Sequence, residues 1–228
     1  MDVSQMNDEY LALFLSKFGS PTEVVVATSE QIERYRGILP DKLLEYWQQM
    51  GFSGFQDGLF WFTNPAEFED VLESFLKDTE FADYDDYHVI ARSAYGELYL
   101  WGEKTGYSLA IKPHLNWIKT CSGNEEDISR GNQDVAVQSF FGFRKPKNVD
   151  LQVGSKLLFP SVIKTYGPVG KDEVMVFTPY LFMGGKKSVD AMAKENLQVF
   201  LRIMADLGGA EIIDMAAMVS NVIKHYEG

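Results

Sequence analysis

Hydrophobic residues recur at helical spacing in three segments of the first 80 residues. The pattern of apolar positions three and four apart predicts amphipathic helices over residues 6–19, 39–51 and 65–77. Pro40 is typical of the first turn of a helix, and a glycine follows the last apolar position of the first two segments. In the third helix the apolar side chains would face the core and the carboxylates would face outward.

The apolar pattern changes its period after these helices. A short run at 23–28 and a second at 58–65 favour strands. Three runs at 87–94, 97–103 and 107–113 are rich in β-branched and aromatic residues and are separated by glycine-containing turns. This spacing predicts an antiparallel meander. Helices followed by a sheet indicate an α+β unit, which ends with a helical stretch in the second half of 124–143.

The remaining chain is predicted to be mostly helical. Residues 154–167 favour a helix kinked or interrupted at Pro160, and residues 174–177 favour a strand. The longest amphipathic pattern of the chain covers 188–209, with Ser188 as the expected N-cap.

A last helix is expected over 210–228, and no internal repeat is visible. The predicted fold class is therefore α+β, with N-terminal helices plus an antiparallel sheet, followed by a smaller, mostly helical α+β unit at the C-terminus.

Charge supports a division into two units. The chain has 228 residues, of which 46% are hydrophobic, and a net charge of −12. Residues 1–140 carry a net −14, whereas residues 141–228 carry a net +2. Such asymmetry between halves suggests two units with different surfaces. We place the boundary in the basic segment 143–150 and predict domains at 1–142 and 147–228.

Composition excludes several functional classes. An acidic chain lacks the cationic surface that binding of nucleic acid or of anionic membranes requires. The N-terminus has neither the basic start nor the apolar core of a secretory signal. Cys121 is the single cysteine, so a disulfide framework and a cysteine-based zinc site are excluded. We therefore expect a cytoplasmic protein.

The most unusual local feature is an acidic segment. Residues 67–86 contain nine carboxylates and one cation. Two interpretations remain open from charge alone: a solvated face that keeps the protein soluble, or a docking surface that steers a basic partner. Aromatic residues interleave with the acids, as they do in interface hot spots. The candidate partner-binding residues are Asp78, Glu80, Asp83, Tyr84, Asp85, Asp86 and Tyr87.

Catalytic, metal and cofactor sites find little support. The pattern of acids ending at His88 has the ligand types of a metal site but lacks the glycine and the terminal glutamate of a calcium loop. No nucleophile elbow is present, and Cys121 lacks an evident activating base. The stretch GGKKS at 184–188 fails the phosphate-loop pattern, although it could hold an anion at a helix start. We expect no enzyme activity, no cofactor and no specific metal.

A family resemblance makes the second half more specific. Its features are a glycine-rich turn at 167–170, an acidic pair, an apolar strand, the pattern Pro-x-Leu-x-x-Gly-Gly at 179–185, and a helix from Ser188. This run resembles the C-terminal domain of bacterial immunity proteins that neutralise type VI secretion DNase toxins. The first half, with its early helix, the segment 39–65 and the meander, resembles the GAD-like domain that precedes it in those proteins.

The resemblance implies a cytoplasmic, non-enzymatic bacterial protein that protects its producer and sibling cells by binding one cognate DNase toxin directly and stoichiometrically. A cationic nuclease would match the acidic domain. Two alternatives are kept: a GAD-like binding or regulatory module that acts with a translation-related partner, and an undetected enzyme or small-ligand binder with a pocket between the two units.

Overall fold

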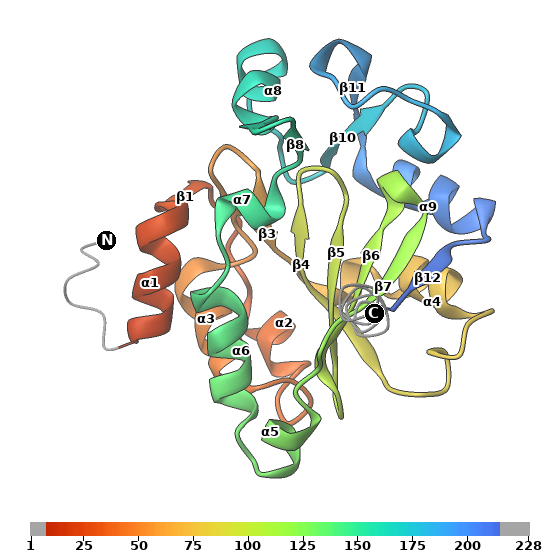
Figure 1. The fold of residues 1–228 in the computed structure, drawn as a ribbon. Helices are drawn as coiled ribbons and strands as arrows, with labels where there is room; N and C mark the ends of the chain where they lie inside the picture. The colour runs from red at the N-terminus through yellow and green to blue at the C-terminus, as the bar shows by residue number, and fades with distance from the viewer. Residues whose placement is uncertain (1–7, 215–228) are drawn as a thin grey trace, which may run out of the picture.

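The computed structural model describes residues 8–214 and has an α+β fold (Figure 1). One large sheet has the strand order β1-β2-β3-β4-β5-β6-β7-β12, and helices cover both of its faces. A smaller group of elements, around α8 and the hairpin of β10 and β11, lies at one end of this sheet. The predicted fold class is confirmed.

Helices and connecting strands form the first part of the chain. In order these elements are α1 (Glu9–Phe18), β1 (Pro21–Glu23), α2 (Ser29–Glu33) and α3 (Asp41–Met50). Asp8 caps α1 by accepting hydrogen bonds from two backbone N–H groups of the first turn, and Gly19 follows its end at a φ of 75°. The helices predicted over residues 6–19 and 39–51 are therefore confirmed as α1 and α3. The expected strand at 23–28 is wrong, because β1 ends at Glu23 and the valines that follow are largely exposed.

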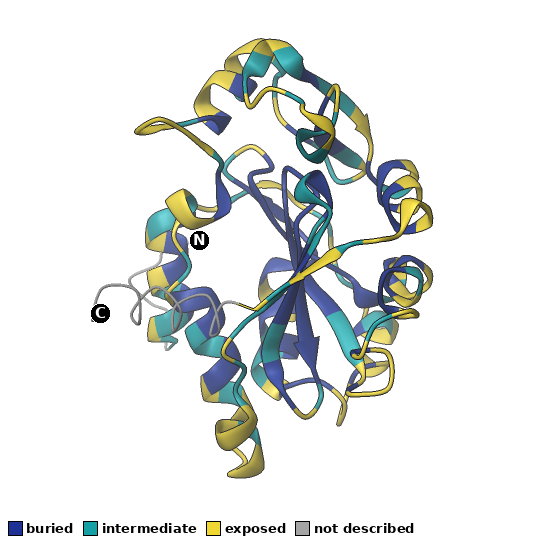
Figure 2. Cartoon of the chain, turned by 45° about the vertical axis from the view of Figure 1, so that its right-hand side comes forward, coloured by how far each residue is buried: buried dark blue, intermediate teal, exposed yellow. Residues whose placement is uncertain are grey.

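The meander predicted from the strand pattern forms the centre of the sheet. The three predicted strands are β4 (Tyr87–Ser93), β5 (Leu98–Gly102) and β6 (Gly106–Lys112), and β2 (Gly54–Phe55), β3 (Phe60–Phe62) and β7 (Trp117–Thr120) extend the sheet on either side. All pair antiparallel with their neighbours, and the sheet ends with β12 (Glu211–Ile213), which runs parallel to β7. Buried residues line the sheet along its length (Figure 2).

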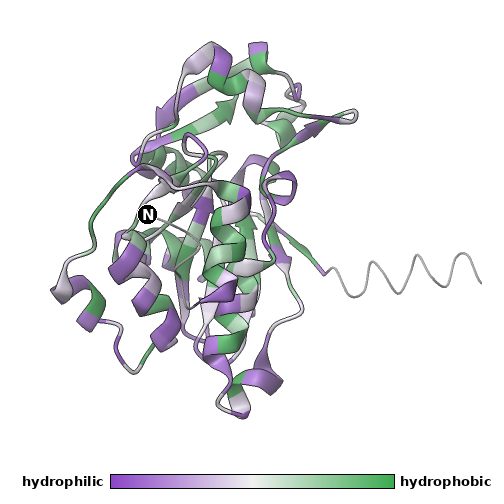
Figure 3. Ribbon diagram, turned by 90° about the vertical axis from the view of Figure 1, so that its left-hand side faces the viewer, coloured by the Kyte–Doolittle hydropathy of each residue, from purple (hydrophilic) through white to green (hydrophobic). Residues whose placement is uncertain are grey.

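Two hydrophobic cores fill the two faces of the sheet. The first lies under α1, α3 and α6 (Gln133–Gly142), with the short α5 (Glu125–Ser129) before α6. The second lies under α4 (Glu69–Leu76) and α9 (Leu197–Leu207), which pack against each other. The 3-10 turns η2 (Pro65–Glu67) and η3 (Pro113–Leu115) precede α4 and β7. Hydrophilic positions alternate with hydrophobic ones along the helices (Figure 3), as the sequence pattern requires.

The C-terminal elements contain more strands than expected. They are α7 (Pro146–Val149), β8 (Gln152–Val153), β9 (Lys156–Leu157), α8 (Phe159–Tyr166), β10 (Glu173–Phe177), η4 (Leu181–Met183), η5 (Val189–Ala191) and β11 (Met192–Asn196). Pro160 does not interrupt a helix. It lies in the first turn of α8, where a backbone N–H would have no hydrogen-bond acceptor within the helix.

The helix predicted over 188–209 is correct only in its second half. Residues 192–196 pair as β11 with β10 across five antiparallel positions, and Asn196, not Ser188, caps α9. The helix expected over 210–228 begins instead with strand β12, and its remainder lies outside the described residues. In both cases a strand partner that is distant in sequence overrides the local helical pattern.

The two predicted domains share their cores. Residues from both sides of segment 143–150 contribute to each hydrophobic cluster. The Tyr95 hydroxyl donates a 2.6 Å hydrogen bond to Asp150 across the boundary. The buried Arg92 guanidinium lies over the Trp61 ring and donates to the carbonyls of Gly170 and Lys171. The boundary at 143–150 stays a prediction, and the packing across it is continuous.

Candidate partner-binding surface

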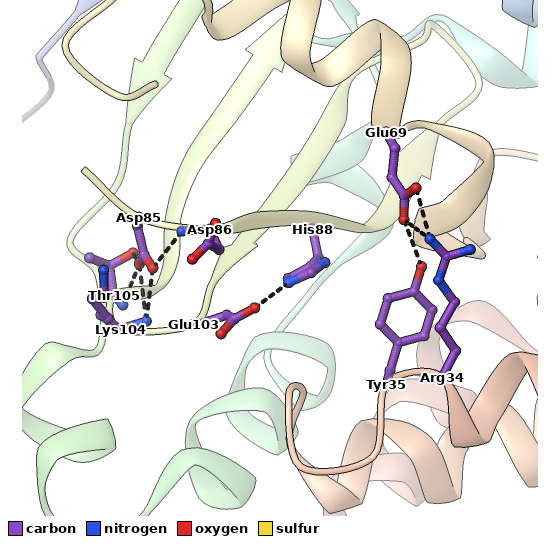
Figure 4. Close-up of polar contacts among 9 residues, drawn as sticks. All are labelled: Arg34, Tyr35, Glu69, Asp85, Asp86, His88, Glu103, Lys104 and Thr105. Atoms are coloured by element: carbon purple, nitrogen blue, oxygen red, sulfur yellow. Dashed lines mark hydrogen bonds and ion pairs between the residues drawn. The ribbon is translucent and has the colours of Figure 1, made fainter. Parts of the chain in front are cut away.

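The acidic segment leads from α4 into β4 through a loop that the structure divides into inward and outward residues. Asp85 is the inward residue: it is 6% exposed. Its carboxylate accepts hydrogen bonds from the backbone N–H groups of Lys104 and Thr105 and from the Thr105 hydroxyl, at 2.7 to 3.1 Å (Figure 4). Asp85 therefore holds the β5–β6 turn in place and is not available to a partner.

The remaining predicted residues stay at the surface. Five are exposed and Tyr87 is half-buried. The exposed five are Asp78, Glu80, Asp83, Tyr84 and Asp86. We call these five residues together with Tyr87 the acidic loop surface. Four carboxylates and two tyrosines combine long-range attraction for cations with aromatic contact area. The role of this surface in partner binding stays a prediction.

Two shallow cavities border the acidic loop surface. One, of about 450 Å³, lies between α4 and the loop and is lined by Leu72, Leu76, Asp83 and Asp86 among others. The second, of about 290 Å³, is lined on one side by Tyr84 and Tyr87 and on the other by Cys121 and β12. Cavities lined by both apolar and acidic side chains suit the insertion of Lys or Arg side chains, whose stems are apolar.

Polar pairs adjoin this surface. His88 Nε2 lies 2.9 Å from a Glu103 carboxylate oxygen, so the histidine of the predicted ligand pattern faces β5 (Figure 4). Arg34 makes a two-pronged ion pair with Glu69 at 2.7 and 2.9 Å. Burial together with the nearby Glu69 carboxylate raises the pKa of Tyr35 to about 12. Within residues 8–214 no cluster of three His, Cys, Asp or Glu side chains is arranged to hold a metal ion.

The other residues considered from sequence lie apart from one another. Cys121 is partly buried, and burial raises the pKa of its thiol, so the nucleophilic thiolate is disfavoured. His114 lies buried in η3, and His225 lies outside the described residues. The stretch 184–188 lies between η4 and η5, so the helix start that an anion site there would need is missing.

Sequence analysis missed two arginines whose surroundings are unusual. Arg92 is 2% exposed and packs against Trp61, and burial lowers the pKa of its guanidinium to about 9. Arg144 lies over three aromatic rings at the end of α6. From the sequence the basic segment containing Arg144 indicates only a domain boundary, because cation–π stacking depends on side chains from strands far away in the sequence.

Two family models match successive parts of the chain. Residues 9–115 match the GAD-like domain, and residues 134–208 match the C-terminal domain of the T6SS immunity protein Tdi1. The crystal structure of Atu4351 from Agrobacterium tumefaciens superimposes with a TM-score of 0.74 and 19% sequence identity, covering 89% of this chain and 91% of that chain. At this identity the likeness shows a shared fold. No curated protein sequence matches the chain. Over residues 8–214, the longest apolar helices fall short of a membrane span.

Proposed function

We propose that this chain, which belongs with the type VI secretion immunity proteins that join a GAD-like domain to a Tdi1 C-terminal domain, neutralises a cognate DNase toxin by direct binding. The match of residues 134–208 to the Tdi1 immunity domain carries the immunity role. Neutralisation takes place in the bacterial cytoplasm, where the toxin would otherwise reach the DNA of the producer and its siblings.

Charge supports a DNase as the target. A DNA-cleaving domain presents a cationic groove to the phosphate backbone. This chain carries a net charge of −12 and exposes acidic and aromatic side chains together on the acidic loop surface. Such a surface steers a cationic partner at long range and offers tyrosines for contact at short range. The protein therefore needs no catalytic residue, because binding that blocks or distorts the active site of the nuclease is sufficient.

The experiment is co-purification with the product of the adjacent toxin gene, followed by a DNA-cleavage assay on the complex. We expect a stable one-to-one complex with cleavage abolished and a Kd of about 1 nM or below. The interface should bury roughly 1,600 Å² or more. Failure to bind, or binding with full nuclease activity, would overturn the proposal and favour a GAD-like regulatory module with a translation-related partner.

A further inference from the structure

The guanidinium of Arg144 is held over an aromatic platform. Its central carbon lies 4.2 Å from the ring centroid of Phe140, 4.6 Å from that of Tyr99 and 5.2 Å from that of Tyr107. Phe140 comes from α6, and the two tyrosines come from β5 and β6. The three rings also contact one another, with centroids 4.7 to 6.2 Å apart. Stacking on several rings fixes the orientation of a guanidinium plane.

Arg144 has no anionic partner among the described residues. No carboxylate of residues 8–214 lies within ion-pair distance of it, and its buried Nε makes no hydrogen bond to these residues. Glu97, which precedes β5 and acts electrostatically on Tyr99 of the platform, is already paired with Lys112 at 2.9 Å. The buried hydroxyl of Tyr99 is also without a hydrogen-bond partner. Buried polar groups are normally satisfied, so this unmatched donor set requires an explanation.

Other cations lie beside Arg144. Lys17 donates to the carbonyl oxygens of Gly142 and Arg144, and its pKa is lowered by burial and by the nearby Lys145. Lys145 and Lys147 follow in the chain and are exposed. Like charges brought together repel one another, and a bound anion would relieve that repulsion.

We propose that Arg144 on its aromatic platform binds an acidic side chain of the toxin, as a second contact of opposite charge to the acidic loop surface. This inference rests on the proposed function. The planar, two-pronged guanidinium edge matches a carboxylate. The net charge of −12 would repel a free polyanion such as DNA. A cationic toxin is attracted by the same charge, and a single carboxylate on its surface would reach Arg144 as part of that toxin.

The aromatic platform of Arg144 lies on the α6 side of the sheet, whereas Tyr87 of the acidic loop surface packs against the core on the opposite side. The two are linked at Cys121. Cys121 lines the cavity that also contains Tyr84 and Tyr87, and its thiol contacts Tyr107 of the aromatic platform. Phe143, which precedes Arg144, is 64% exposed. An arginine next to an exposed aromatic residue has the composition of an interface hot spot. The partner surface should therefore be mainly cationic, with at least one carboxylate facing Arg144.

The test compares toxin binding of the wild-type protein and an Arg144→Met variant. Methionine still covers the three rings, so we expect the unfolding midpoint to stay within a few degrees of wild type. Affinity for the co-encoded toxin, measured by surface plasmon resonance, should fall at least about tenfold, mainly through faster dissociation. Arg144→Lys keeps the charge without the planar fork and should lose affinity to a smaller degree.

Lys147→Met is the matched control, because it removes one exposed cation of the same basic segment away from the rings. It should bind within about twofold of wild type. If Arg144→Met also binds within twofold while the wild type binds and inhibits the toxin, the inference is overturned and the proposed function stands. If the wild type does not bind the toxin, both fail. Acetate stabilising the wild type but not Arg144→Met, with unchanged toxin affinity, would identify a site for free anions and also overturn it.

Discussion

The Asp85 carboxylate accepts two hydrogen bonds from Thr105, one from the backbone N–H at 2.9 Å and one from the hydroxyl at 2.7 Å. This pairing ties the loop after α4 to the β5–β6 turn, 20 residues further along the chain. One carboxylate of the most acidic part of the protein is thus a structural cap, while its neighbours are free to meet a partner.

Asp85→Ala should therefore destabilise the protein. Removing the acceptor leaves the buried donors of Thr105 and the part-buried N–H of Lys104 without this partner, and we expect a loss of about 2–3 kcal/mol in the free energy of unfolding. The measurement is urea denaturation followed by tryptophan fluorescence. Asp83→Ala, at an exposed position of the same loop, is the control and should change stability by less than about 0.5 kcal/mol. Equal effects of the two substitutions would contradict the structural role.

Charge reversal on the acidic loop surface should slow association with the toxin. The triple variant Glu80→Lys, Asp83→Lys and Asp86→Lys avoids Asp85, so the loop keeps its fold. We expect the association rate constant to fall at least about tenfold at low salt, with the difference shrinking as ionic strength rises. Stopped-flow fluorescence at several salt concentrations measures this.

A second triple variant separates local from overall charge. The substitutions Asp190→Lys, Glu195→Lys and Asp206→Lys change the net charge by the same amount, at exposed positions of the C-terminal elements. If both triple variants slow association equally, only the net charge matters and the acidic loop surface is not the docking face.

Sequence patterns predicted the elements whose stabilising contacts are local or repeat regularly. Helices α1 and α3 have capping residues and apolar stripes within their own segments, and the meander from β4 to β6 has short turns. Residues 192–196 read Met-Ala-Lys-Glu-Asn, a composition that favours a helix, and become a strand because β10 supplies the partner. Strand β12 likewise depends on β7, over 90 residues earlier.

The candidate surface likewise has features that the sequence predicts and others that depend on contacts between distant segments. Charge and aromatic content located the acidic segment, but every aspartate in it looks alike in the sequence. Only the folded β5–β6 turn shows that Asp85 points inward and Asp86 outward. Arg144 could not be found at all from sequence, because its three rings come from α6, β5 and β6.

The burial of His114 predicts that the protein loses stability in mild acid. Its ring is 3% exposed, neither nitrogen makes a hydrogen bond to a residue within 8–214, and burial with nearby Lys112 and Lys187 lowers its pKa to about 3. The unfolded chain binds a proton near pH 6.5, whereas the folded protein stays neutral. Stability is therefore complete above pH 6.5 and falls between pH 6.5 and 3 as the unfolded state gains the proton.

Between pH 7 and pH 5 this difference amounts to about 2 kcal/mol. His114→Phe puts an aromatic ring without a titratable group at this position. From pH 7 to pH 5, its free energy of unfolding should therefore fall by about 2 kcal/mol less than that of the wild-type protein. Urea denaturation at both pH values measures the difference. Parallel losses in the two proteins would show that His114 does not contribute to the acid sensitivity.

The shared cores predict that residues 1–142 do not fold alone. The second core needs Phe200, Leu201 and Met204 from α9 to cover the sheet face opposite α6. Without them the apolar side chains of α4 and β5 would meet water, at a cost of about 25 cal/mol for each Å² exposed. We expect the isolated fragment to lack a cooperative thermal transition and a dispersed amide NMR spectrum, while the full chain shows both. A fragment that unfolds cooperatively would establish the boundary at 143–150 as a true domain boundary and would make α9 a dispensable cover of that face.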